Sequence, residues 1–191
     1  MHRPIARLAV LLTALLAVPA FASPASNAVA KPVKTVVQAV RFSKDDLALK
    51  QFALEAQGAY LLEGQWEKGS PAQRAEFKKL FQVLFAKMAF PKIRENFKNL
   101  AAINYDEAKI SGDKATVGSL ILINHPLKKQ ELKLKYEIVK EGAGWKVKDV
   151  EVLGDSMLVG IRDDQVRPIM SEGGWPKLLE LMRVKAKELS K

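Results

Sequence analysis

The sequence predicts an α+β domain in which helices pack on one face of a curved antiparallel sheet of about four strands. Apolar residues from Phe77 to Met88 recur at the spacing of a helix. Residues 131–140 alternate instead between apolar and charged side chains, as in a half-buried strand. Helical spacing returns after Gly154 and continues to the end of the chain. We therefore expect helices, then an antiparallel meander, then helices again.

The first 22 residues have the three parts of a cleaved secretory signal. Arg3 and Arg7 give a basic start, residues 8–18 form an apolar run, and Ala20-Phe21-Ala22 supplies the small-x-small cleavage pattern before Ser23. The apolar run is about half of the roughly 20 residues that a membrane span needs. We therefore expect export, cleavage near Ala22-Ser23 and a soluble mature chain.

The charge balance and the lack of cysteine exclude several classes of protein. The chain has 31 Lys and Arg against 21 Asp and Glu, a net charge of +10, which usually suggests a nucleic-acid or membrane-surface partner. Loss of Arg3 and Arg7 with the signal lowers the charge to +8, and an exported chain does not meet DNA, so no nucleic-acid partner is expected. With no cysteine and two histidines, we expect no disulfide, no metal site and no cofactor.

The region before the first expected helix has no regular pattern. Residues 23–34 are rich in Ala, Pro, Ser and Lys, and we interpret residues 23–42 as a flexible leader with one short apolar segment. A single domain is expected over residues 43–191. Ser43 has the character of an N-cap, and Asp45 and Asp46 suit the first turn of a helix.

The next helix has a strong start signal. Ser70, Pro71 and Gln73 combine an N-cap, a proline at the first helical position and the third-position partner of a capping box. We expect Pro91 to break this helix, with one more short helical segment over residues 92–100.

Four strands are expected over residues 103–110, 115–123, 131–140 and 145–153. Apolar alternation slips at Lys148-Asp149, which predicts a β-bulge or a strong local twist. After Gly154 we expect helices, with a possible kink at Pro168, a break over residues 172–176 and a final amphipathic helix.

No group of residues indicates catalysis. His125 is the one histidine that remains after processing, and it lies beside a proline in a strand connection, where a solvated loop residue is the simpler interpretation. Asp163 and Asp164 are adjacent, so on a helix they point in different directions. No nucleophile, metalloprotease or phosphate-loop motif is present. We therefore expect no catalytic residue and a protein that is not an enzyme.

The lysines of the expected meander have two interpretations. They can keep an outward sheet face soluble and unpaired, or they can approach anionic lipid head groups or an acidic docking partner. These residues are Lys128, Lys129, Lys133, Lys135, Lys140, Lys146 and Lys148.

Large, soft apolar side chains occur on several elements that should converge. A phenylalanine and methionine stripe of this kind is most often ordinary core, but it can also line an adaptable apolar cavity. The residues are Tyr60, Phe77, Phe81, Phe85, Met88, Tyr136, Met157, Ile161, Met170 and Met182.

Three motifs occur in order between about Ser43 and Leu189. The motifs are Trp66 with SPAQRAEF over residues 70–77 and Leu80-Phe81, then WKVKDV over residues 145–150 with GDSML over 154–158 and Arg162, then Gly173-Gly174-Trp175. Together they resemble the MlaC, or toluene-tolerance, family of periplasmic phospholipid-binding proteins. The chain departs from the family pattern at Gly160-Ile161, where Asn-Tyr is usual, and at Gln165, where an aromatic residue is usual, so the exact lipid stays open.

The resemblance implies a periplasmic lipid carrier with an apolar pocket between helices and sheet. It also implies two partners, an inner-membrane MCE-domain ABC transporter and an outer-membrane lipoprotein complex, with lipid passing between the two membranes. We expect a monomer. Arg162 is expected either to approach the head group or to hold its loop in place. The expected pocket-lining residues are Tyr60, Phe77, Phe81, Phe85, Leu122, Tyr136, Met157, Leu158 and Ile161.

Two other functions stay open at this point. One is a small-molecule enzyme on a cone-shaped α+β fold, which would need an acid or base inside its pocket. The other is a non-catalytic docking subunit whose apolar residues form a filled core.

Overall fold

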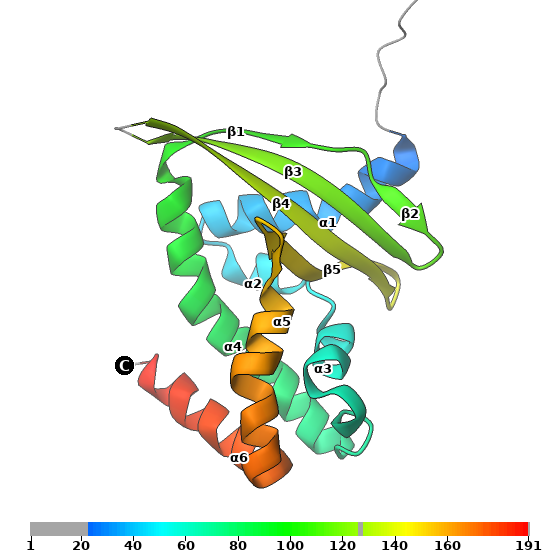
Figure 1. The fold of residues 1–191 in the computed structure, drawn as a ribbon, viewed down its shortest axis with the longest axis vertical. Helices are drawn as coiled ribbons and strands as arrows, with labels where there is room; N and C mark the ends of the chain where they lie inside the picture. The colour runs from blue at the N-terminus through cyan, green and yellow to red at the C-terminus, as the bar shows by residue number, and fades with distance from the viewer. Residues whose placement is uncertain (1–22, 126–127, 191) are drawn as a thin grey trace, which may run out of the picture.

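A sheet lies at one end of the molecule, and the helices extend from one of its faces (Figure 1). This computed structural model describes residues 23–125 and 128–190; the expected signal, residues 1–22, lies outside the described residues. The predicted α+β class is confirmed, with helices on one face of an open, curved antiparallel sheet.

The sheet has six strands where about four were expected. They are β1 (Leu100–Tyr105), β2 (Lys109–Ser111), β3 (Lys114–His125), β4 (Lys128–Glu141), β5 (Gly144–Val152) and β6 (Asp155–Ser156). The hydrogen-bonded order is β1-β3-β4-β5-β6, and β2 also pairs with β3. His125 ends β3 and is not in the loop where the sequence placed it; its side chain lies outside the described part.

The first expected strand is divided into β1 and β2, and the segment between them bonds once to β3 and once to Ser26 outside the sheet. The Asp106 amide donates to the carbonyl of Gly118 at 3.0 Å, and the Ala108 amide donates to the Ser26 hydroxyl at 2.8 Å. A side chain at Gly118 would collide with the carboxylate of Asp106, since an added Cβ would lie 2.1 Å from Oδ2. The strand therefore leaves the ladder between Tyr105 and Lys109.

The predicted bulge is present at Lys148. Glu137 faces Asp149 across the β4–β5 pair and Ile138 faces Val147, so Lys148 is the extra residue. The bulge brings both Val147 and Val150 into the core between sheet and helices. It also leaves the Lys148 carbonyl free to accept a side-chain hydrogen bond from Gln57.

The prediction of a flexible leader over residues 23–42 is wrong, because α1 (Pro24–Arg41) is a helix packed against the sheet. The Ser23 hydroxyl caps it by accepting from the Ser26 amide at 3.1 Å. Val29, Val33 and Val40 are fully buried. These small β-branched residues, together with Pro32 inside the helix, give a weak helical signal.

The expected helix from Ser43 is two helices, α2 (Asp45–Leu49) and α3 (Leu54–Leu62), followed by the 3-10 turn η1 (Glu63–Gln65). Ser43 is not the cap, since it has a φ of +55° and Lys44 precedes the helix. Between α2 and α3 the chain runs parallel to β5. The Val147 amide donates to the Gln51 carbonyl at 2.8 Å, and the Ala53 amide donates to the Val147 carbonyl at 2.9 Å.

Helix α4 (Pro71–Asn96) begins with the predicted capping box, in which Ser70 and Gln73 bond reciprocally. The expected break at Pro91 does not occur: the helix continues to Asn96, and the 3-10 turn η2 (Phe97–Asn99) follows. Proline removes one backbone donor, but fully buried Phe90 anchors the chain just before it. The helix therefore reaches from the sheet to the far end of the molecule (Figure 1).

The C-terminal arm contains α5 (Met157–Ile161), the π-helix η3 (Arg162–Val166) and α6 (Arg167–Glu188). Pro168 lies in the first turn of α6, where proline is compatible with a helix. The predicted break is present at Gly174, whose φ of +59° interrupts α6. The second half of α6 then turns back beside α4 (Figure 1).

Two apolar cores stabilise the fold, and α4 contributes to both. The sheet-side core joins α1, α2 and the end of α4 to β3, β4 and β5 and includes Phe90. The helical core joins α3, the start of α4, α5 and α6 and includes Trp66, Phe77 and Trp175. Among the helices of residues 23–125 and 128–190, none has the length and hydrophobicity of a membrane span.

Candidate functional site

An apolar groove of about 520 Å³ lies between α4 and the C-terminal arm. Phenylalanine, leucine and methionine side chains form most of its wall, and no carboxylate lines it. The lining residues are Phe77, Phe81, Leu84, Phe85, Met88, Ala89, Lys92, Met157, Ile161, Gln165, Val166, Ile169, Leu178, Leu181, Met182 and Lys185.

Five of the residues that the sequence suggested as pocket lining meet in this groove. Phe77, Phe81 and Phe85 come from α4, and Met157 and Ile161 come from α5. The phenylalanines are in ring contact with their neighbours, with centroids 5.7 Å apart for Phe77 and Phe81 and 6.1 Å apart for Phe81 and Phe85. No strand residue lines the groove, although we expected the pocket between helices and sheet.

Tyr60 does not line this groove. It lies on α3 between two cations, with the Lys148 ammonium 4.7 Å and the Arg162 guanidinium 4.9 Å from its ring centroid. It lines a separate surface groove between α3 and the strands β2, β3 and β4. Tyr60 therefore belongs to a cationic surface and not to the apolar groove.

Three further candidates are also outside the groove. Tyr136 is buried in the sheet-side core, where its hydroxyl lies 3.2 Å from that of Ser119 and burial raises its pKa. Leu158 is buried in the helical core. Leu122 is half-buried in β3, opposite Ala102 and Glu131. Their sequence positions resembled those of lining residues because core and groove share the same apolar composition.

Arg162 is held by acidic neighbours. Its Nε donates to Oδ1 of Asp163 at 2.7 Å, its NH2 group donates to Oδ2 at 3.2 Å, and Glu63 lies 3.8 Å away. The hydrogen bond from Arg162 lowers the pKa of Asp163. Of the two expected roles of Arg162, this arrangement indicates the structural one, since the guanidinium connects the π-helix to the end of α3.

Buried Asp149 positions the α5 wall of the groove. Its Oδ1 accepts from the Leu158 amide at 3.1 Å and from the Val150 amide at 2.8 Å, and its Oδ2 accepts from the Ser156 hydroxyl. The same hydroxyl accepts from the Val159 amide at 3.0 Å and so caps α5. Asp149 therefore holds the first turn of α5 against β5 and places Met157 and Ile161.

An ion pair joins the two walls of the groove. The Arg183 guanidinium on α6 donates to both carboxylate oxygens of Glu76 on α4, at 2.6 and 2.9 Å. The hydrogen bond from Arg183 lowers the pKa of Glu76. This pair ties the second half of α6 to α4 outside the apolar lining.

The mouth of the groove combines apolar and basic side chains. Met88 is 48% exposed and Leu181 is 37% exposed, and both line the groove. Within residues 23–125 and 128–190, the charged residues that line it are Lys92 and Lys185, and Lys185 also pairs with Glu188 at 3.2 Å. An apolar molecule with a negative head group fits this distribution, because its chain meets carbon while its charge meets ammonium groups.

Sequence reasoning did not assign the α6 half of the wall, although it named Met182 among the side chains that could line a cavity. Leu178 and Met182 fall on the apolar face that predicted the final amphipathic helix, but nothing in that pattern separates groove from core. Gln165 and Val166 lie in the π-helix, a local conformation without a sequence signature here. Leu84, Met88 and Lys92 continue the α4 stripe by helical spacing.

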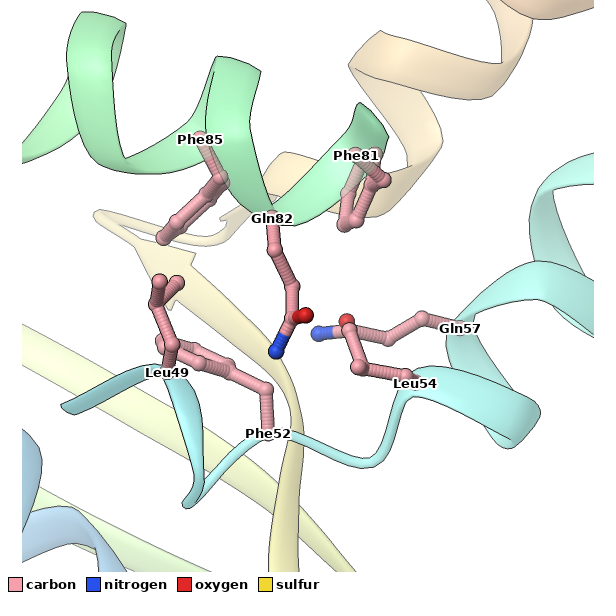
Figure 2. A pocket seen from close by; sticks show the side chains of 7 residues that line it. All are labelled: Leu49, Phe52, Leu54, Gln57, Phe81, Gln82 and Phe85. Atoms are coloured by element: carbon pink, nitrogen blue, oxygen red, sulfur yellow. The ribbon is translucent and has the colours of Figure 1, made fainter. Parts of the chain in front are cut away.

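A second, much smaller pocket of about 10 Å³ lies behind the phenylalanines (Figure 2). Leu49, Phe52 and Leu54 form one side of it, and Phe81 and Phe85 point into it from α4. The carboxamides of Gln57 and Gln82 supply its polar atoms. Because Phe81 and Phe85 also line the large groove, their rings separate the two spaces.

Titratable side chains are few in the described lining of the apolar groove. No cluster of three or more His, Cys, Asp or Glu side chains with the geometry of a metal site occurs within residues 23–125 and 128–190. Among the residues that the structure describes, no Asp or Glu lines the groove. Its apolar wall and basic mouth suit binding.

Comparison with known proteins places the fold. The chain is similar to a solved phospholipid-binding protein from Ralstonia solanacearum in complex with a phospholipid, with 17% identity and a TM-score of 0.70 over 88% of this chain and 100% of that chain. The chain is more weakly similar to an NTF-2 like protein of unknown function from Shewanella oneidensis. The identity is 14% and the TM-score 0.41, over 67% of this chain and 98% of that chain. No curated protein sequence matches.

A family model described as MlaC protein matches residues 30–184. The match begins inside α1 and ends near the close of α6, so it includes every element that forms the groove. It also begins 13 residues before Ser43, which agrees with the packing of α1 into the domain. The chain belongs to the MlaC family.

Proposed function

We propose that this protein is a non-enzymatic lipid carrier that holds phospholipid acyl chains in the apolar groove between α4 and the C-terminal arm. The groove itself is the observation that carries the proposal. It is open, lined by hydrocarbon and free of carboxylates, and its two charged lining residues are lysines at the mouth. Family membership and the lipid-bound relative of the same fold support the choice of ligand.

The volume and the energetics suit one acyl chain. The groove volume of about 520 Å³ lies within the range of ~300–1,000 Å³ that is typical of ligand sites. Burial of about 16 methylenes is worth about 13 kcal/mol, at ~0.8 kcal/mol each. A second chain requires additional space, which movement of the α6 arm or of the phenylalanine partition would provide.

The wider setting belongs to the same proposal. The apparent signal over residues 1–22 supports export to the periplasm. A lipid with two chains loses more than about 20 kcal/mol on leaving a bilayer for water, so transfer between membranes requires a carrier. We infer that the protein shuttles lipid between an outer-membrane lipoprotein complex and an inner-membrane MCE-domain ABC transporter, and that it does so as a monomer.

The alternatives lack support in the groove. An enzyme would need an acid or base inside its pocket, and the described wall has no Asp, Glu or His, while its two lysines lie at the mouth. A docking subunit with a filled core would not leave about 520 Å³ open beside Met88 and Leu181.

Lipid extraction and native mass spectrometry of the purified mature protein test this function. We expect copurified phospholipid, or uptake from vesicles by the delipidated protein. Phe81→Asp places a charge in the groove and should abolish loading. Phe42→Asp is the matched control, because Phe42 is 65% exposed and outside the groove, and it should load normally. A folded wild-type protein that neither contains nor takes up lipid would exclude the carrier.

A further inference from the structure

Gln57 has the one buried side-chain polar atom without a hydrogen-bond partner among the residues that the structure describes. The residue is 4% exposed, and its carboxamide oxygen Oε1 accepts no hydrogen bond. A buried acceptor of this kind is destabilising when nothing donates to it. A hydrogen-bond donor at this position would remove that cost.

The direction of the Gln57 oxygen is set by the other half of its amide. Nε2 donates to the carbonyl of bulge residue Lys148 at 2.8 Å. A flipped amide would place Oε1 against that carbonyl, oxygen facing oxygen, so the observed orientation is the stable one. With Nε2 engaged by the Lys148 carbonyl, Oε1 is the atom that remains to accept a hydrogen bond, and Gln57 lines the small pocket behind Phe81 and Phe85 (Figure 2).

Water serves this acceptor poorly. The pocket of about 10 Å³ is at the lower limit for one water molecule. A buried water also needs two to four polar partners; leucine and phenylalanine form most of the described wall, and the carboxamides of Gln57 and Gln82 supply no more than the minimum. A donor attached to a hydrocarbon chain has no such requirement, since its chain contacts the rings. A cationic donor is excluded by the apolar wall, which has no carboxylate to pair with it.

The large groove leads to this acceptor. Phe81 and Phe85 line both spaces, and the ring of Phe85 also contacts Phe52 with centroids 5.1 Å apart. Because these two rings separate the spaces, a change in their orientation is what would connect them. From Lys92 at the mouth to Phe81 the path along α4 is about 16 Å, at 1.5 Å per residue. A chain whose head stays at the lysines therefore reaches Gln57 with its middle or far half.

We propose that Gln57 is a specificity-determining residue of the lipid-binding site and accepts a hydrogen bond from a hydroxyl group on the acyl chain of the bound lipid. The inference rests on the proposed lipid carriage and narrows the class of lipid to one with a hydroxylated chain. An added hydroxyl ordinarily weakens binding to an apolar site, because it must be desolvated. Tighter binding of the hydroxylated chain than of the parent chain would therefore indicate a hydrogen-bond acceptor inside the site.

Two pairs of fatty acids test this specificity in the mature protein. Ricinoleic and oleic acids differ by one hydroxyl near the middle of the chain, and ω-hydroxypalmitic and palmitic acids differ by one at its end. Displacement of a fluorescent fatty acid gives the four affinities. We expect the wild type to bind the hydroxylated member of at least one pair about two- to tenfold more tightly than its parent.

Gln57→Met keeps the length of the side chain and removes the acceptor, so the preference should reverse in favour of the parent acid. Gln57→Leu serves the same purpose if Q57M does not fold. Gln51→Met is the matched control, because Gln51 is a nearby glutamine whose side chain bonds the Leu47 carbonyl outside the pocket, and it should retain the wild-type preference.

Failure of the inference and failure of the proposed function give different results. A wild type that binds both parent acids more tightly than their hydroxylated partners, or shows no difference, overturns the role of Gln57 while lipid carriage stands. A preference that persists in Q57M and Q57L also overturns it. A protein that binds no fatty acid and takes up no phospholipid removes the carrier and this inference together.

Discussion

The indole ring of Trp175 occupies the space that a side chain at Gly69 would need. A Cβ built at Gly69 would lie 2.4 Å from Cζ2 of Trp175, and the Trp175 Nε1 donates to the Gln65 carbonyl at 3.0 Å. The loop before α4 is thereby fixed to the residue that follows the break in α6. This contact sets the direction of the second half of α6, and with it one wall of the groove.

Gly69→Ala should destabilise the protein by about 1–3 kcal/mol, because Trp175 or the loop must move to admit the methyl group. Gly64→Ala is the control: it lies five residues earlier, and a Cβ there meets no atom within 4 Å. Urea denaturation of both variants measures the difference. If G69A and G64A were equally stable, the loop would accommodate the added methyl group without loss of stability.

Val33→Ala should cost about 2 kcal/mol of folding free energy, because Val33 is fully buried in the sheet-side core. Lys31→Ala, exposed on the same helix, should change the stability little. Thermal denaturation of the mature protein distinguishes them. If V33A were as stable as K31A, residues 24–41 would not contribute to the folded domain.

Asp149→Ala should destabilise the fold by about 1–3 kcal/mol, since it leaves the buried Leu158 amide without its acceptor. The variant should also load less lipid, because Met157 and Ile161 lose their fixed position. Asp155→Ala, exposed in neighbouring β6, is the control for both measurements. If D149A were destabilised but loaded lipid normally, lipid binding would not depend on the position of α5.

The Glu76–Arg183 pair should make the groove sensitive to acid. Arg183 lowers the pKa of Glu76 from its ordinary 4.5, so the contribution of Glu76 to stability is complete above that value. It is lost as the pH falls through the lower pKa of the folded state. Glu76→Gln removes this dependence, and the gap between wild type and E76Q should close in acid.

Urea midpoints and lipid retention between about pH 7 and pH 3 test the acid dependence of this pair. Glu107→Gln, an exposed substitution between β1 and β2, should follow the wild type throughout. If the wild type were still more stable than E76Q at the lowest pH, the Glu76–Arg183 pair would not be the cause of the difference.

The local chemistry of the sequence predicts much of the fold. Ser70 and Gln73 form the capping box that their spacing indicates, because a cap depends on residues within one turn. The slip in alternation at Lys148 marks a real bulge, because strand parity is also local. Pro91 shows the limit of such rules: burial of Phe90 keeps the helix intact where proline alone predicts its end.

The groove required information that no local pattern contains. Phe77 and Phe81 lie on one helical stripe, yet Phe77 is buried in the helical core while Phe81 stays half-buried. The difference depends on where the second half of α6 lies, and Gly174 and the contact of Trp175 with Gly69 decide that. Gln57 could not be recognised at all from the sequence, since its unpaired oxygen is visible only once its neighbours are in place.

The stretch between α2 and α3 also covers part of one border of the sheet. Its hydrogen bonds with Val147 occupy one part of the outer border of β5, and β6 occupies another part through Glu151 and Val152. An uncovered border would present a row of free donors and acceptors on which a second molecule could extend the sheet. Variants that lengthen or loosen residues 50–53 are therefore expected to polymerise before they lose the groove.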